Sequence, residues 1–146
     1  MSRLILGAGK SWPKEPGDIF VDIRKFEGID VAHDLNVTPW PFKDNSSTEI
    51  SAIHLVEHLK DLLTFMNECW RVLEKGGELY IETPMAGADI QLTHADPTHV
   101  RCYTQYTWIN YFTKVGIAKF GYTDKPWAIL NCQVDSVIRI HLTPIK

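Results

Sequence analysis

The sequence is poor in several features that would assign a small protein to a class at once. Only three of its 146 residues are cysteine (Cys69, Cys102 and Cys132), they lie far apart, and no CxxC pair is present. Scattered cysteines in odd number argue against a disulfide framework and indicate a reducing setting. No apolar run approaches the roughly 20 residues that a membrane-spanning helix requires, and no signal-peptide pattern precedes the first apolar run. We therefore expect a cytoplasmic protein without a membrane partner.

The charge balance also lacks a strong excess of one sign. The chain has 15 Lys and Arg residues and 18 Asp and Glu residues, which gives a net charge of −3. Such a chain has no long-range attraction for nucleic acid and shows no basic stripe, which argues against duplex nucleic acid as a partner. The length and the 45% hydrophobic content predict one domain over residues 1–146.

The apolar residues that are present fall into short runs bounded by turn residues. These runs predict five strands: Arg3–Leu6, Ile19–Asp22, Asp30–His33, Ile50–Leu55 and Glu78–Thr83. Few of them alternate cleanly between apolar and polar, which favours strands covered on both faces, as in a parallel sheet. The segment from Trp127 to Ile145, with Asp135-Ser136 near its middle, predicts a closing antiparallel hairpin.

Two helices are expected. The first runs from Lys60 to Glu74, and Gly76 is available for a left-handed cap after it. Its apolar residues repeat with the helical period: Leu62, Phe65, Met66, Cys69 and Leu73. The second runs from Thr104 to Val115 and stops at Gly116. It is expected to bury Trp108, Ile109 and Phe112.

The first connections leave little room for helices. Nine residues separate Gly9 from Ile19, and Pro13, Pro16 and Gly17 among them prevent a helix of several turns. Only seven residues separate Asp22 from Asp30, fewer than a helical crossover normally needs. The front half of the sheet is therefore expected to be thinly covered on at least one side.

The first strand runs into Gly7-Ala8-Gly9-Lys10-Ser11, which invites comparison with nucleotide-binding loops. The triphosphate loop GxxxxGK[ST] requires a glycine where Leu4 stands, and a helix beginning at Gly-Lys-Ser. The prolines exclude that helix, and with it the cradle for the pyrophosphate of a dinucleotide. What remains is a glycine turn and a second strand ending in Asp22, whose carboxylate can accept bonds from both hydroxyls of a ribose. This favours a nucleoside cofactor that needs no phosphate clamp.

Several segments in order resemble the class I S-adenosylmethionine-dependent methyltransferases, and more narrowly a compact bacterial and phage branch of them. The matching segments are LILGAGKSWPKEPGDIFVDI, GIDVAHDLNVTPWPF, IHLVEHLKD, FMNECWRVLEKGGELYIETP and HADPTHVRCYTQYTWINYF. Ser11 stands where the family has a third glycine, and the helix after the first strand is absent. The resemblance implies a Rossmann-like α/β sheet, mostly parallel with a C-terminal antiparallel hairpin and fewer helices in the N-terminal half.

The same resemblance implies that S-adenosyl-L-methionine is the cofactor. Its methionine portion would lie beside Gly7, Ala8 and Gly9, where the glycines allow close backbone approach. The residues expected around the rest of the cofactor are Asp22 for the ribose, Ile23, Asp34 and Leu35 for the adenine, and His54 and Leu55 near the sulfonium.

Several of these residues have structural alternatives. Asp22 can be a turn acid, Asp34 can bond its own loop, and His54 can be a buried imidazole bonded to a carbonyl. Glu57 and His58 lie where a helix is expected to begin, so a favourable interaction with the helix dipole or a capping role explains Glu57 at least as well as chemistry does.

The stretch from Thr93 to Arg101 follows the fifth strand and gathers titratable side chains on the expected substrate side. His99 or His94 is the candidate general base, with Asp96 orienting the imidazole. The alternatives are a polar surface loop stiffened by Pro97, and a site in which these His and Asp residues bind zinc or iron. A metal is not part of the preferred interpretation.

The function implied by the resemblance is methyl transfer by direct in-line displacement, without a covalent enzyme intermediate. No Asn/Asp-Pro-Pro-aromatic segment follows the fourth strand, where His54-Leu55-Val56-Glu57 stands, so a small-molecule or sugar acceptor is favoured over nucleic acid. A homodimer could complete the active site. The alternatives are a catalytically inactive methyltransferase-like binding or assembly module, and a metal-dependent hydrolase.

Overall fold

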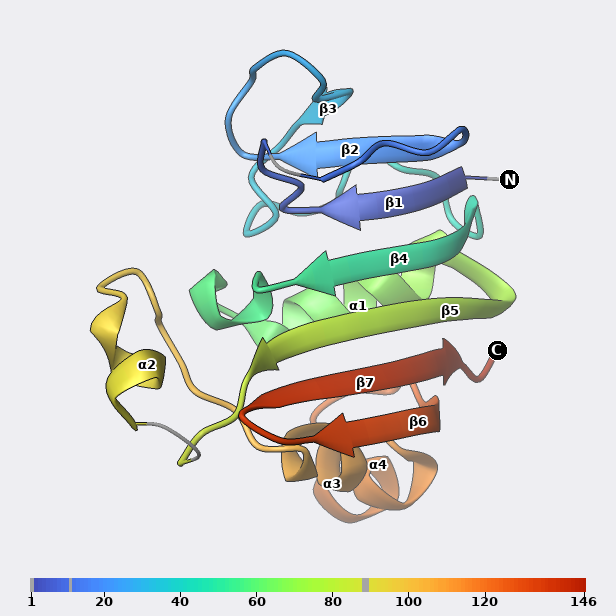
Figure 1. Ribbon diagram of the computed structural model, residues 1–146. Coiled ribbons are helices and arrows are strands. Elements are labelled where there is room, and N and C mark those ends of the chain that lie inside the picture. Colours follow the sequence, from blue (N-terminus) through green and yellow to red (C-terminus); the bar gives the residue numbers. More distant parts are fainter. Residues whose placement is uncertain (1, 11, 88–89) are drawn as a thin grey trace.

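Seven strands form one mixed sheet in the order β3-β2-β1-β4-β5-β7-β6 (Figure 1). The computed structural model describes residues 2–10, 12–87 and 90–146, so Ser11 lies outside the described residues. The strands are β1 (Ser2–Leu6), β2 (Asp18–Asp22), β3 (Val31–Ala32), β4 (Ser47–Ile53), β5 (Leu73–Pro84), β6 (Trp127–Val134) and β7 (Val137–Pro144). The first five pair in parallel, and β7 pairs antiparallel with β5 and β6. The predicted mostly parallel sheet with a C-terminal hairpin is confirmed.

The helices are η1 (Val56–His58), α1 (Leu62–Val72), α2 (Ile90–Ala95), α3 (Tyr106–Tyr111) and α4 (Lys114–Phe120). The predicted helix α1 begins after Asp61, whose carboxylate accepts from the Leu63 N–H at 2.9 Å. Its predicted end at the glycines is wrong. Leu73 is already extended because it pairs with Ser47 as the first residue of β5. No described helix is both long and apolar enough to span a membrane.

The second predicted helix is two short ones, so this prediction is wrong in detail. Thr113 breaks the run because its hydroxyl accepts from the Gly116 N–H at 3.3 Å and thereby starts α4. Gly116 is not a stop signal: it packs so closely against α3 that a Cβ there would lie 2.0 Å from the Asn110 carbonyl oxygen. Trp108 and Phe112 are buried as expected, whereas Ile109 is 36% exposed.

Helices cover only one face of the sheet. In the view of Figure 1, α1, α3 and α4 lie behind the strands, and no described helix covers the front. Strands β5 and β7 accordingly alternate between buried and half-buried residues over most of their length. The expectation of strands covered on both faces is therefore wrong for β5 and β7, whereas β1, β2 and β4 each contain three consecutive buried residues, as expected. No described helix lies in the connections of β1, β2 and β3, so the thin helical cover predicted for the N-terminal half of the sheet is confirmed.

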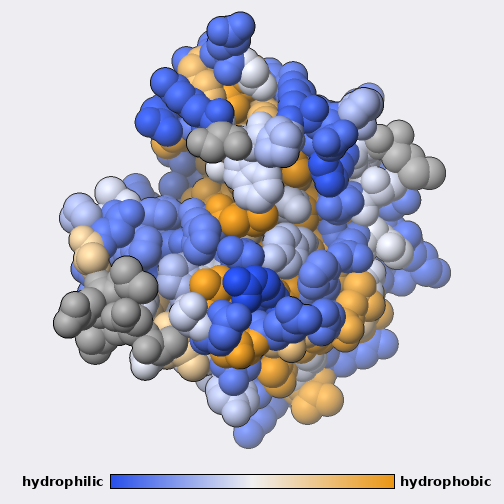
Figure 2. Space-filling model, viewed as in Figure 1, coloured by the Kyte–Doolittle hydropathy of each residue, from blue (hydrophilic) through white to orange (hydrophobic). Residues whose placement is uncertain are grey.

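The uncovered face of the sheet is polar where β5 and β7 meet. The Tyr80 hydroxyl donates to Glu82 Oε2 at 2.8 Å, and Arg139 Nε donates to the same oxygen at 3.2 Å. His141, beside them, contacts Glu78. Burial, followed by the Glu82 carboxylate, raises the pKa of Tyr80 to about 12. Figure 2 shows this face, with hydrophilic residues among the hydrophobic ones. In a parallel sheet with two covered faces, helices would pack against this face. Here polar side chains of β5 and β7 lie there instead.

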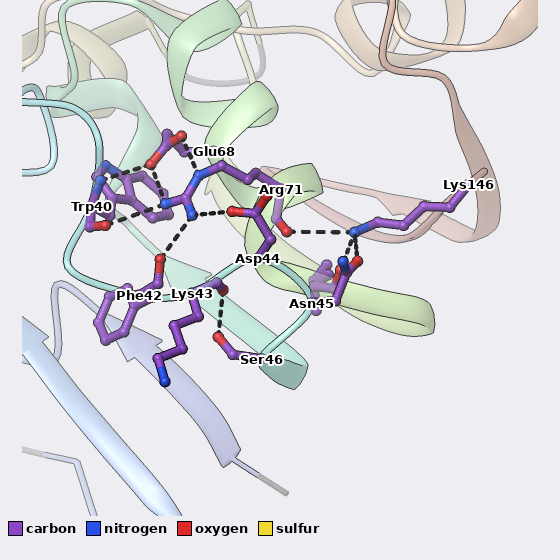
Figure 3. Close-up of polar contacts among 10 residues, drawn as sticks. Trp40, Phe42, Lys43, Asp44, Asn45, Ser46, Glu68, Arg71 and Lys146 are labelled. Carbon is purple, nitrogen blue, oxygen red and sulfur yellow. Dashed lines mark hydrogen bonds and ion pairs between the residues drawn. The ribbon is translucent and has the colours of Figure 1, made fainter.

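A buried ion-pair network fastens the long β3–β4 connection to α1 (Figure 3). Arg71 donates to both oxygens of Glu68 at 2.8 Å, to Asp44 at 2.7 Å, and to the carbonyls of Trp40 and Phe42 at 3.2 and 2.8 Å. Glu68 also accepts from the Trp40 N–H at 2.7 Å. Burial raises the pKa of Glu68, but the bonds from Arg71 and Trp40 outweigh burial, so the pKa lies below its usual value. This network lets the chain cross from β3 to β4 without a helix.

Replacing Arg71 with Met should lower the free energy of unfolding by about 2–4 kcal/mol, because the buried Glu68 carboxylate loses its cation. Chemical denaturation at neutral pH, followed by circular dichroism, measures the change. The exposed Lys75→Met variant is the control and should stay within about 0.5 kcal/mol of the wild type. A change of the same small size in the Arg71 variant would contradict the network's role.

Asp18 should contribute to acid denaturation. Its hydrogen bond with Arg3 lowers its pKa, and its side chain is 2% exposed. Because the folded-state pKa is depressed, the stabilisation is present above the unfolded pKa of about 3.9 and disappears as pH falls through the folded value. We expect Asp18→Asn to lower the free energy of unfolding by about 1–2 kcal/mol at pH 7, with the difference shrinking as the pH falls below the unfolded pKa. A pH-independent difference in urea denaturation would contradict this.

Candidate functional site

A cavity of about 540 Å³ lies at the carboxyl ends of β1, β2 and β4. These ends meet at the left edge of the sheet in Figure 1, where open α/β sheets bind ligands. The lining residues come from all three strand ends and from two loops: Gly7, Gly9, Asp22, Ile23, Arg24, His33, Asp34, Leu35, Asn36, His54, Leu55, His58, Leu59 and Thr98. Eight of the nine residues predicted to contact a cofactor are among them.

The glycine turn shapes one wall of the cavity. Gly7 and Gly9 have φ angles of 65° and 59°, in the left-handed region that favours glycine. A Cβ on Gly7 would lie 3.0 Å from Leu55 Cδ1, whereas a Cβ on Gly9 would have no neighbour within 4 Å. Gly7 therefore allows the turn to pack on Leu55, and Gly9 faces open space. Ala8 does not line the cavity, because its side chain packs with Ile5 and Phe20.

Asp22 joins the ends of β1 and β2. Its Oδ2 accepts from the Gly9 N–H at 3.1 Å and its Oδ1 from the Arg24 N–H at 3.0 Å. The residue is 7% exposed and lines the cavity. Because each carboxylate oxygen offers two acceptor positions, one on each remains after these bonds. Asp22 is thus a turn acid and still has acceptor capacity for a ligand.

Asp34 and Leu35 form the opposite wall. Asp34 Oδ1 accepts from the backbone and the side-chain amide of Asn36 at 2.9 and 3.0 Å, which is the local turn weighed from the sequence. The backbone bond, with the amide bond next, lowers the pKa of Asp34. Its Oδ2 accepts no bond from a described residue. Leu35 is buried, while Ile23 is 64% exposed. Of the two apolar side chains at this cavity, only Leu35 is thus shielded from solvent by the rest of the protein.

His54 directly follows β4 and lines the cavity. Its φ of 49° is left-handed, and its N–H donates to the Glu82 carbonyl at 2.8 Å. The imidazole is half exposed, with Nδ1 3.4 Å from Glu57 Oε1 and Nε2 3.3 Å from Glu82 Oε1. The interpretation of His54 as a buried imidazole bonded to a carbonyl is therefore wrong. The ring is held between two carboxylates instead.

Glu57 does not cap a helix. It is 2% exposed, and its Oε2 accepts from the Thr83 hydroxyl at 3.0 Å. Its Oε1 has no hydrogen-bond partner among the described residues. No side-chain cap is formed at η1, so the capping interpretation is wrong, although Glu57 does lie in the first turn of η1 as the dipole interpretation requires. A buried carboxylate oxygen without a donor calls for an explanation.

The three candidate catalytic residues of the 93–101 stretch line one hollow of about 460 Å³, distinct from the cavity at the ends of β1, β2 and β4. His94 is exposed there and contacts Cys102. Asp96 Oδ2 lies 3.8 Å from His99 Nε2, too far for a hydrogen bond. His99 also contacts a residue of the cavity, because its ring packs edge-on against His58 with centroids 4.7 Å apart.

The sequence analysis missed six lining residues: Arg24, His33, Asn36, His58, Leu59 and Thr98. Arg24 and Asn36 directly follow predicted site residues, so their position next to Ile23 and Leu35 was a usable signal. Thr98 lies within the 93–101 stretch expected on the substrate side, but its contact with this cavity depends on backbone pairing with a distant segment. The Val100 N–H donates to the Glu57 carbonyl at 2.8 Å and fixes the loop against η1.

Comparison with known proteins adds to this geometry. A methyltransferase-domain family model matches residues 22–81. A probable S-adenosylmethionine-dependent methyltransferase from Mycolicibacterium smegmatis is 33% identical over 60 residues, which are 41% of this chain and 23% of that protein. The similarity to this relative thus spans less than a quarter of the relative's length. The matched range of the family model includes Asp22, Asp34 and His54.

Solved structures show the same fold. A methyltransferase from Archaeoglobus fulgidus matches with a TM-score of 0.65 and 16% identity, covering 97% of this chain and 86% of that one. YcgJ from Bacillus subtilis matches with a TM-score of 0.60 and 20% identity, covering 90% of this chain and 64% of that one. A chain from the complex of the Haloferax volcanii Trm112 methyltransferase activator with a putative methyltransferase matches with a TM-score of 0.67 and 9% identity. The match covers 99% of this chain and 83% of that one.

The two glycines should respond differently to alanine. Gly9→Ala should lose about 1 kcal/mol of unfolding free energy, from the left-handed backbone alone. Gly7→Ala should lose about 2–3 kcal/mol, because Leu55 must also move. Thermal and urea denaturation of both variants measure the difference, and an equal or greater loss at Gly9 would contradict the described turn.

Proposed function

We propose that the chain is a class I S-adenosylmethionine-dependent methyltransferase, which binds S-adenosyl-L-methionine in the cavity at the ends of β1, β2 and β4 and transfers its methyl group. The matches to a methyltransferase-domain family model and to a probable S-adenosylmethionine-dependent methyltransferase support this proposal. The observation that carries this proposal is the joint placement of the Gly9 turn and the Asp22 carboxylate on one cavity. A volume of about 540 Å³ lies within the range of small-ligand sites.

The residues present fit this cofactor. The open space beside Gly9 supports close approach of the methionine portion to the backbone at Gly7, Ala8 and Gly9. The unused acceptor positions of Asp22 suit the two ribose hydroxyls. Asp34 Oδ2 would accept from the adenine amino group, and Ile23 and Leu35 would pack on the ring. His54 and Leu55 would lie near the sulfonium, where the carboxylates of Glu57 and Glu82 supply negative charge.

The bound cofactor supplies an electrophilic methyl group on a positively charged sulfur. The protein would contribute alignment of the acceptor with that methyl group and exclusion of water. An oxygen or nitrogen acceptor must lose a proton during transfer, and His99 is the candidate base supported best, because it adjoins His58 at the cavity. Asp96 would orient His99, and His94 would act only if the acceptor extends into the hollow that these three residues line.

The acceptor is proposed to be a small molecule or a sugar. The net charge of −3 gives no general attraction for duplex nucleic acid. A cytoplasmic location is inferred from three free cysteines, and a homodimer that completes the cavity stays a prediction.

Isothermal titration calorimetry with the cofactor and its demethylated product tests the proposal. We expect both to bind the wild type, and Asp22→Asn to weaken binding at least about tenfold, because an amide NH₂ would oppose the Gly9 N–H and remove a charged acceptor. Asp124→Asn, a change at an exposed acid, is the matched control. Absence of binding at millimolar concentration would overturn the proposal, and binding without transfer to any acceptor would indicate an inactive module.

A further inference from the structure

Glu57, His58 and His99 converge beside the cofactor cavity. Each offers one ligand atom, and the three atoms all lie within 4.8 Å of one another. Glu57 and His58 belong to η1, and His99 belongs to the loop that the Val100–Glu57 backbone bond holds against it. This group differs from the His94, Asp96 and His99 set considered from the sequence, because Glu57 and His58 of η1 take the place of His94 and Asp96.

Both imidazoles are oriented through one nitrogen only. His58 Nδ1 lies 2.9 Å from the Thr98 hydroxyl and 3.3 Å from the Thr98 carbonyl. His99 Nδ1 lies 2.8 Å from the Thr93 carbonyl. A histidine that binds a metal normally bonds its second ring nitrogen to a carbonyl or carboxylate in this way, which fixes the tautomer. Nε2 of each ring is thereby left as the ligand atom.

Glu57 supplies the observation that points to a cation. Its side chain is 3% exposed, Oε2 is satisfied by Thr83, and Oε1 has no hydrogen-bond partner among the described residues. His54 Nδ1 lies 3.4 Å away but outside hydrogen-bonding geometry. Burying an ionised carboxylate is costly unless a donor or cation compensates it.

We propose that Glu57, His58 and His99 bind a divalent first-row transition-metal ion. Two imidazoles with one carboxylate are a ligand set for zinc or ferrous iron, whereas calcium and magnesium prefer all-oxygen sites. Donors bound to one such ion lie about 3.4 Å apart, given bonds of about 2.0–2.2 Å, so the three side chains need to move inward by about an ångström. Asp96 Oδ2, 3.8 Å from His99 Nε2, offers a further anionic oxygen.

The ion would act on the methyl acceptor, and this part rests on the proposed function. Three protein ligands would leave at least one coordination position for the acceptor. One of the ligands, His58, lines the cofactor cavity, so the ion would lie beside it. An acceptor hydroxyl bound there loses its proton to water more readily, as metal-bound water does. The oxygen lone pair then forms the new O–C bond while the C–S bond breaks and its electron pair stays on sulfur. The acceptor class is therefore a small molecule with a metal-binding hydroxyl group.

Metal binding can be measured without any methyl-transfer assay. The chelator-treated full-length protein is titrated with Co²⁺ and with Zn²⁺, with visible absorption of the cobalt complex and elemental analysis after dialysis as readouts. We expect one ion per chain and d–d absorption typical of nitrogen and oxygen ligands. Glu57→Gln, His58→Asn and His99→Asn should each weaken Co²⁺ binding more than about 100-fold, and Thr98→Val about 10–100-fold.

His141→Asn is the matched control, since His141 lies on the uncovered sheet face and should leave Co²⁺ affinity unchanged. Circular dichroism spectra and melting curves identify any variant that does not fold, and at least two folded ligand variants decide the result. Wild-type protein that binds neither ion, or folded ligand variants with unchanged affinity, would overturn the metal site. Metal binding without cofactor binding in the calorimeter would instead reject the proposed function and leave the site standing.

Discussion

The hydrogen bond from the Gly9 N–H to Asp22 is the contact on which the site depends. It joins the ends of two neighbouring parallel strands, and it exists only because Gly9 adopts a left-handed conformation without cost. The same bond holds a nearly buried carboxylate at the edge of the sheet, with acceptor capacity left over. The cavity between β1 and β4 is therefore fixed by backbone geometry, and its chemistry is set by one acid.

The structure compensates for its few helices with side-chain contacts. Arg71 and Glu68 tie the β3–β4 connection to α1, and Lys14 pairs with Asp30 at 2.6 Å across the β1–β2 connection and the approach to β3. The exposed sheet face carries polar side chains that water can solvate. Loops that would otherwise be mobile are in this way held by charge and by buried indoles such as Trp40, whose Nε1–H donates to the Leu35 carbonyl at 3.1 Å.

The loop after α2 packs against η1 at the edge of the cavity. Its backbone bond from Val100 to Glu57 and its Thr98 contact with His58 bring two histidines and a buried glutamate together at the cavity edge. The same loop carries the candidate base for methyl transfer and the proposed metal ligand His99. These two roles are alternatives for that imidazole, since a metal-bound nitrogen cannot also accept a proton.

The sequence by itself determined the parallel strands, the closing hairpin, the missing first helix and the glycine–acid pair, because each depends on local residue pattern: apolar runs, prolines in a short connection, and an acid ending a strand. It misjudged the end of α1, the division of α3 from α4 and the covering of β5 and β7, because strand pairing and close helix contact override local propensity. Only the tertiary structure decided that Glu57 and His58 meet His99. Those contacts join segments about 40 residues apart, and no local spacing records which backbone groups will pair across that distance.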